Sequence, residues 1–86
     1  GEVVNAQNLG LRGDIAVEEN DLQSAAELFT KAIEISNNQF TYETITRKLA
    51  LVYAAMGDND KVTELYKALV AKYPNLKFQY TKYIVE

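Results

Sequence analysis

The sequence predicts an all-α fold made of helix hairpins. Apolar residues recur at helical spacing in nearly every segment of the 86 residues, and no stretch alternates with the period of two that is typical of strands. One proline and four glycines are the only strong helix breakers. The second half of the chain also repeats the first at an offset of 37 residues, which favours a repeated helix pair over a single bundle.

Polar segments divide the chain into helices. The first two meet at Asn20-Asp21, where Asp21 is placed to accept a hydrogen bond from the first free amides of a helix; Asp58 is placed in the same way before the fourth. A polar segment at 37–39 separates the second helix from the third. Pro74 ends the fourth, because its ring cannot continue a helix. We therefore expect helices at about residues 4–19, 21–36, 41–56, 59–73 and 76–85.

The repeat is clearest when 29–32 is aligned with 66–69. Gly13 then falls on Ala50, and Asn20 falls on Gly57. This pattern resembles the tetratricopeptide repeat family, in which small residues stand where two helices cross closely and large residues fill the space between them. The matching residues are Gly13, Ala25, Phe29 and Ala32 in the first unit and Ala50, Tyr53, Gly57, Tyr66 and Pro74 in the second.

The chain departs from the family pattern at several positions. Arg12 stands at a usually large apolar position, Asn20 at the usual turn glycine, and Val62 and Leu69 at usual alanines; three extra residues lie between the units. The resemblance implies a right-handed solenoid of two antiparallel hairpins within one domain, residues 1–86. Repeat one covers about 6–39, repeat two about 43–76, and a capping helix about 76–85. Ile84 falls at a small position, which favours a cap over a third repeat.

Members of this family commonly bind a peptide or helix on the concave face formed by the first helix of each unit. By resemblance, that face takes Gln7, Gly10, Asp14 and Val17 from the first unit and Thr44, Arg47, Leu51 and Ala54 from the second. We expect a partner segment to rest on Val17, Leu51 and Ala54, with Arg47 as polar anchor; the alternative for Arg47 is a solvent-facing residue. Gly10 and Asp14 replace two residues of the clamp that some members use for a C-terminal carboxylate.

Composition argues against catalysis, cofactors and nucleic acid. The net charge is −3, whereas phosphate binding needs clustered positive charge. Without histidine or cysteine, the usual zinc sites and thiolate chemistry are excluded, and no cofactor is expected. Asp14 and Glu18 could pair an acid with a base, but a solvated acidic stripe is the better interpretation. The segment from Asp58 lacks the glycine and the final glutamate of a calcium loop. We expect a binding protein, not an enzyme.

Self-association is the alternative to partner binding. Residues 1–36 carry a net charge of −5 and residues 37–86 one of +2, which permits head-to-tail attraction between copies or simply two differently charged helix pairs. The C-terminal aromatic residues fit either a core seam between the last two helices or a contact surface, since one helix cannot hide them all. The residues concerned are Tyr73, Phe78, Tyr80 and Tyr83, of which Phe78, Tyr80 and Tyr83 are the candidates for self-association.

Cellular location stays open. The longest apolar run, 49–56, is too short to cross a bilayer, so no membrane insertion by this segment is expected. Gly1 stands in place of an initiator Met, so both a complete chain and a piece of a longer one are possible. The ends of the last two segments, around Lys72-Tyr73-Pro74 and Lys82-Tyr83, resemble the C-terminal repeats of the ancillary subunit of the bacterial Sec translocon. That resemblance implies a membrane-anchored periplasmic parent; a cytoplasmic location is the alternative.

Overall fold

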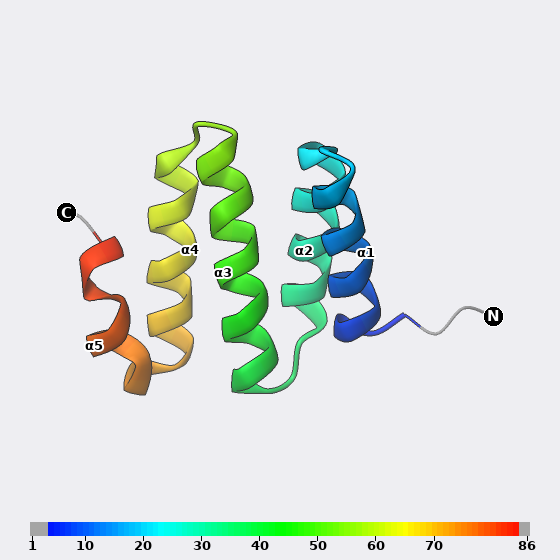
Figure 1. The fold of residues 1–86 in the computed structure, drawn as a ribbon. Helices are drawn as coiled ribbons and strands as arrows, with labels where there is room; N and C mark the ends of the chain where they lie inside the picture. The colour runs from blue at the N-terminus through cyan, green and yellow to red at the C-terminus, as the bar shows by residue number, and fades with distance from the viewer. Residues whose placement is uncertain (1–3, 85–86) are drawn as a thin grey trace.

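Four long helices and a short helical tail follow one another across the molecule (Figure 1). The computed structural model describes residues 4–84, and no strand occurs within that range, which confirms the predicted all-α class. The elements are α1 (Ala6–Glu18), α2 (Leu22–Ile35), α3 (Gln39–Ala55), α4 (Asn59–Lys72), a 3-10 turn η1 (Pro74–Leu76), α5 (Lys77–Tyr80) and a second 3-10 turn η2 (Thr81–Tyr83).

Each helix packs mainly on its neighbours in sequence. α1 packs on α2, α2 on α3 and α3 on α4, while the tail packs on α4; α1 also contacts α3 directly. The array is long and thin, with Cα extents of 41 × 28 × 14 Å. Consequently α1 lies at one end of the array and α5 at the other (Figure 1).

An Asn or Asp side chain caps the N-terminus of every long helix. Asp21 accepts from the Ser24 amide at 3.2 Å and Asp58 from the Lys61 amide at 3.2 Å, as predicted. Hydrogen bonds from the Ser24 side chain and amide lower the pKa of Asp21 below its ordinary value. Asn38 accepts from the Thr41 amide at 2.8 Å, so α3 begins two residues earlier than expected.

The two interhelix turns have the same backbone geometry. Asn20 and Gly57 both adopt positive φ, +60° and +81° respectively. In each turn the next amide reaches back into the preceding helix, from Asp21 to the Ala16 carbonyl at 2.8 Å and from Asp58 to the Tyr53 carbonyl at 2.9 Å. Every equivalent pair is 37 residues apart, so the repeat detected in the sequence is also a repeat of local structure.

The core consists of two clusters that meet at α3. The first lies among α1, α2 and α3 and is centred on Phe29, which is 1% exposed. A Cβ added at Gly13 would overlap the Phe29 ring, so this glycine allows the close approach of α1 to α2. The second cluster joins α3, α4 and the tail and consists of Ala50, Tyr66, Leu69, Leu76 and Tyr80.

The predicted fifth helix is present but is shorter and less regular than expected. The expectation was a single helix at about 76–85, whereas the structure has two 3-10 turns around a four-residue α5; residue 85 lies outside the described residues. The chain leaves regular helix geometry at Tyr80, where φ is −115°. The Tyr80 ring is 7% exposed and stacks on Tyr66 with ring centroids 5.1 Å apart. Burial of this side chain therefore accompanies the break in the helix.

Candidate binding groove between α1 and α3

A groove runs between α1 and α3, with α2 beneath it. Its larger part, which we call the Leu51 lobe, has a volume of about 450 Å³ and a mostly apolar lining. The Phe29 ring from α2 forms part of that lining, and α1 and α3 supply most of the rest. The lining residues of the Leu51 lobe are Asp14, Val17, Glu18, Leu22, Phe29, Lys48, Leu51, Val52 and Ala55.

A second hollow continues the groove toward the N-terminal ends of the same two helices. This hollow, the Phe40 lobe, has a volume of about 280 Å³. Its lining residues are Gln7, Gly10, Leu11, Asp14, Phe40, Thr41, Thr44, Ile45 and Lys48. The two lobes share Asp14 and Lys48, so they are two parts of one surface.

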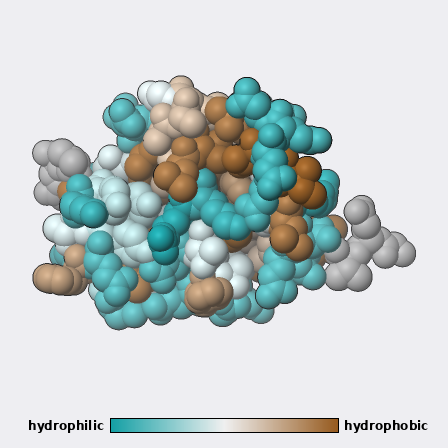
Figure 2. Space-filling model, viewed as in Figure 1, coloured by the Kyte–Doolittle hydropathy of each residue, from teal (hydrophilic) through white to brown (hydrophobic). Residues whose placement is uncertain are grey.

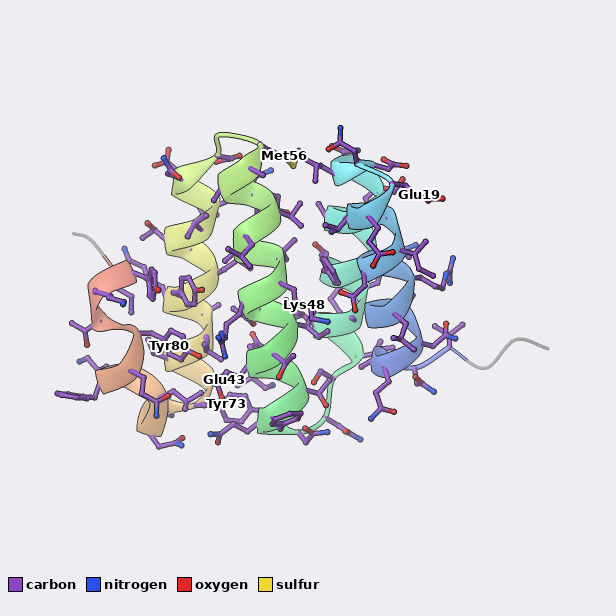
Figure 3. The ribbon with its side chains drawn as sticks, in the orientation of Figure 1. Glu19, Glu43, Lys48, Met56, Tyr73 and Tyr80 are labelled. Atoms are coloured by element: carbon purple, nitrogen blue, oxygen red, sulfur yellow. The ribbon has the colours of Figure 1, made fainter. Side chains whose placement is uncertain are left out.

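An ion pair crosses the groove where the lobes meet. Lys48 Nζ donates to both Asp14 carboxylate oxygens, at 2.9 and 2.8 Å, and thereby joins α3 to α1 (Figure 3). The Lys48 and Asp14 side chains are 39% and 38% exposed, so solvent screens the pair and its contribution to stability is modest, about 0–1 kcal/mol. The pair remains accessible to a polar group from a partner.

Large apolar side chains beside the groove are unusually exposed. Leu51 is 73% exposed, Phe40 78%, and Val17 41%. On the face shown in Figure 2, hydrophobic surface gathers over the C-terminal half of α3 and over α1. Clustered apolar surface of this kind is a mark of interaction sites, whereas single exposed apolar residues are common everywhere.

The structure brings together most of the residues predicted for the concave face. Five of the seven line the groove: Gln7, Asp14, Val17, Thr44 and Leu51. Gly10, which the sequence also placed there, lines the Phe40 lobe as well.

Arg47 and Ala54 are exposed but line neither lobe. Arg47 lies instead on the side of α3 toward the C-terminal tyrosines. Burial raises the pKa of Tyr66 and the positive charge of Arg47 acts against that rise.

The groove-lining residues that were not predicted from the sequence include Leu11, Phe40 and Lys48. The sequence pattern selected Arg47 for the concave face in place of its neighbour Lys48. One step along a helix rotates the side chain by about 100°, and the pattern does not fix the orientation of the helix about its axis that closely. Phe40 was placed before the start of the third helix, and recognising Asn38 as an N-cap would have included it.

The C-terminal aromatic residues divide into buried and exposed members. Tyr66 stacks with both Tyr80 and Tyr83, with ring centroids 5.1 and 4.6 Å away. The Tyr80 hydroxyl also donates to the Glu43 carboxylate (Figure 3). Burial raises the pKa of Tyr80 to about 12, with further contributions from that hydrogen bond and from the Glu43 charge.

The three residues predicted for self-association therefore have different surroundings. Tyr80 is buried and belongs to the second core cluster. Tyr83 is 39% exposed, with one ring face stacked on Tyr66. Phe78 is 94% exposed and is the only one of the three that projects freely into solvent.

Comparisons with protein-family models, with curated proteins and with solved structures each find no match to this chain. Within residues 4–84 every helix is too short or too polar to cross a membrane.

Proposed function

We propose that this chain is a non-catalytic interaction module that binds a helix or extended segment of another protein in the groove between α1 and α3. The observation that carries the proposal is the groove itself. It places Leu51, 73% exposed, and the half-exposed Val17 beside a hollow of about 450 Å³. Covering such apolar surface with a partner is favourable by roughly 25 cal/mol for each Å² removed from water.

The chemistry of the groove indicates the pattern of its ligand. Two apolar lobes flank the Asp14–Lys48 ion pair. A complementary segment carries one apolar side chain for each lobe and a polar residue between them. An amphipathic helix provides this arrangement through apolar residues at positions i, i+3 or i+4, and i+7.

A non-catalytic role is supported by the state of the acidic groups. The sequence contains no histidine or cysteine. The acid–base pair considered from the sequence was Asp14 with Glu18, but both carboxylate oxygens of Asp14 accept hydrogen bonds from Lys48. This ion pair favours a structural or recognition role for Asp14 over proton transfer.

The proposal includes a right-handed solenoid of the tetratricopeptide type, with two hairpins and a C-terminal cap. Its support is the identical turn geometry at Asn20 and Gly57 and the close helix approach at Gly13. The sequential packing of the helices is consistent with such an array. In this arrangement α1 and α3 are the first helices of the two units, which are the helices that form the groove.

The test uses peptides selected on the wild-type chain from a random displayed library. Leu51→Glu puts a charge into the apolar lobe and is expected to weaken binding of the selected peptides at least about tenfold, equivalent to about 1.4 kcal/mol. The matched control is Ile15→Glu, because Ile15 is 54% exposed on α1 but lines neither lobe. Titration calorimetry measures the affinities, and thermal melting checks that both variants remain folded.

Three results would contradict the proposed groove. One is unchanged peptide affinity in Leu51→Glu. Another is an equal loss in Ile15→Glu, which would show that any exposed apolar position on α1 or α3 serves equally well. Failure to select any peptide with apolar anchors would also count against the proposal.

A further inference from the structure

The most exposed large apolar side chain in the described part of the protein is a phenylalanine at the C-terminal end. Phe78 lies on α5 and is 94% exposed. Lys77 precedes it and Lys82 follows it four residues later, and both are exposed. Residues 65–84 contain four lysines and no acidic residue. The end of the molecule that carries Phe78 is therefore an aromatic knob on a positively charged surface.

The Leu51 lobe has the complementary properties. Its apolar lining surrounds a hollow of about 450 Å³, which is larger than one aromatic side chain. Its acidic lining residues are Asp14 and Glu18, and the Asp14 charge is largely balanced by Lys48. Glu18 leads directly into the acidic turn after α1, where Glu19 and Asp21 follow. The rim of the lobe is therefore negatively charged on the α1 side.

We propose that the Leu51 lobe of one copy receives Phe78 of a second copy, with Lys77 and Lys82 facing Glu18 and the turn beyond it. The inference rests on the proposed function, because it assigns an occupant to the same groove. The occupant is favoured by two matches, an exposed aromatic side chain against an apolar hollow, and a lysine-rich surface against an acidic rim.

The positions of the two surfaces determine the kind of assembly. α5 and α1 lie at opposite ends of the array (Figure 1), and the tail packs on α4 and reaches α3 through the Tyr80–Glu43 hydrogen bond, away from α1. One chain therefore cannot place its own Phe78 in its own Leu51 lobe. The contact joins two different surfaces, so every added copy leaves one free knob and one free groove. Such a head-to-tail contact extends into open chains unless the rotation between copies closes a ring.

The association is expected to be weak. One aromatic side chain with a charged rim buries less surface than the standard protein interface. Sedimentation equilibrium of the full chain, from about 10 μM to about 1 mM at low salt, is the suitable measurement for affinities in this range. The average mass is expected to rise continuously with concentration and to fall when salt is added, because salt screens the lysine–acid attraction.

Two variants, each disabling one surface, provide the decisive test. Phe78→Asp removes the knob and leaves the groove intact, whereas Leu51→Glu blocks the groove and leaves the knob intact. Each alone is expected to be monomeric over the whole range. Mixed in equal amounts, they are expected to form a 1:1 dimer and nothing larger, because only one functional knob–groove pair is left. Both side chains are exposed, and melting curves check that each variant is folded.

Ile15→Glu is expected to associate as the wild type does. The inference is overturned if the wild type is monomeric up to the highest concentration or if the mixture stays monomeric. If selected peptides still bind the groove of a strictly monomeric wild type, only this inference fails and the proposed function stands. If Leu51→Glu binds those peptides normally, the groove assignment itself fails.

Discussion

At the scale of single residues, the spacing between α1 and α2 depends on a missing side chain. A Cβ at Gly13 would lie 2.7 Å from Phe29 Cδ1 and 2.9 Å from Cζ. Phe29 is 1% exposed and sits in the first core cluster, so its ring has little room to move. A Cβ at Gly10 would approach only the terminal Cδ1 methyl of Ile45, at 2.9 Å. The two glycines of α1 are therefore under different steric constraints.

Gly13→Ala is expected to lower the free energy of unfolding, and Gly10→Ala to change it little. Both substitutions gain about 1 kcal/mol of helix propensity. At Gly13 that gain is outweighed by overpacking against the ring, which costs roughly 1–3 kcal/mol. At Gly10 the flexible methyl can shift. Urea denaturation is expected to rank Gly10→Ala above Gly13→Ala by at least about 1 kcal/mol; an equal or reversed ranking would show that Phe29 adjusts freely.

At the scale of elements, short-range signals set most helix boundaries. Asp21 and Asp58 cap α2 and α4 as predicted, and the same turn follows α1 and α3. Positive φ at Gly57 is free of steric cost, whereas the same conformation in a residue with a side chain is disfavoured by roughly 1–2 kcal/mol. Asparagine tolerates that conformation better than other residues with a side chain, which explains why Asn20 can occupy the equivalent position.

Gly57→Ala is therefore expected to destabilise the protein by about 1 kcal/mol. Asn20→Ala is expected to cost less, because Asn20 already carries part of the strain. The control is Asn59→Ala, an exposed first residue of α4, which should stay within about 0.5 kcal/mol of the wild type. Thermal and urea denaturation measure all three. A tolerated Gly57→Ala would mean that the turn can be remade without positive φ.

At the scale of the whole molecule, a few long-range contacts hold the ends of the array in place. The Asp14–Lys48 ion pair joins the first hairpin to the second. The hydrogen bond from Tyr80 to Glu43 connects the tail to α3. The Tyr80 ring also stacks on Tyr66, which connects the tail to α4. These aromatic contacts, together with the buried side chain of Leu76, attach the short tail to α3 and α4.

Stability is expected to fall at alkaline pH because of Tyr80. Its pKa is about 12 in the folded protein against an ordinary value of 10.0. A raised folded pKa contributes stability that is complete below pH 10 and is lost as pH rises through about 12. Tyr80→Phe should be less stable than the wild type near neutrality but lose less stability over that interval. Urea denaturation across the pH range measures both chains; parallel pH profiles would exclude Tyr80 as a cause.

Features that depend on neighbours a few residues apart could be predicted from the sequence alone. The all-α class, two of the N-caps, the repeated turn and the small residue at Gly13 all follow from local spacing and local chemistry. The residues of the groove could be predicted only in part. Helical periodicity selects one face of each helix but does not decide which of two adjacent residues lies at the border of that face. That is why Asp14 and Leu51 were predicted for the groove while Lys48 was not.

The place of each aromatic residue at the C-terminus, by contrast, depends on contacts between distant parts of the chain. Phe78, Tyr80 and Tyr83 lie within six positions, and the sequence left all of them open to core or surface. In the structure Tyr80 is 7% exposed and Phe78 is 94% exposed. The physical reason is that the chain after Pro74 forms two 3-10 turns around a four-residue helix, so its phase there depends on which ring packs on Tyr66, a residue of α4. Local periodicity cannot predict a contact of that kind.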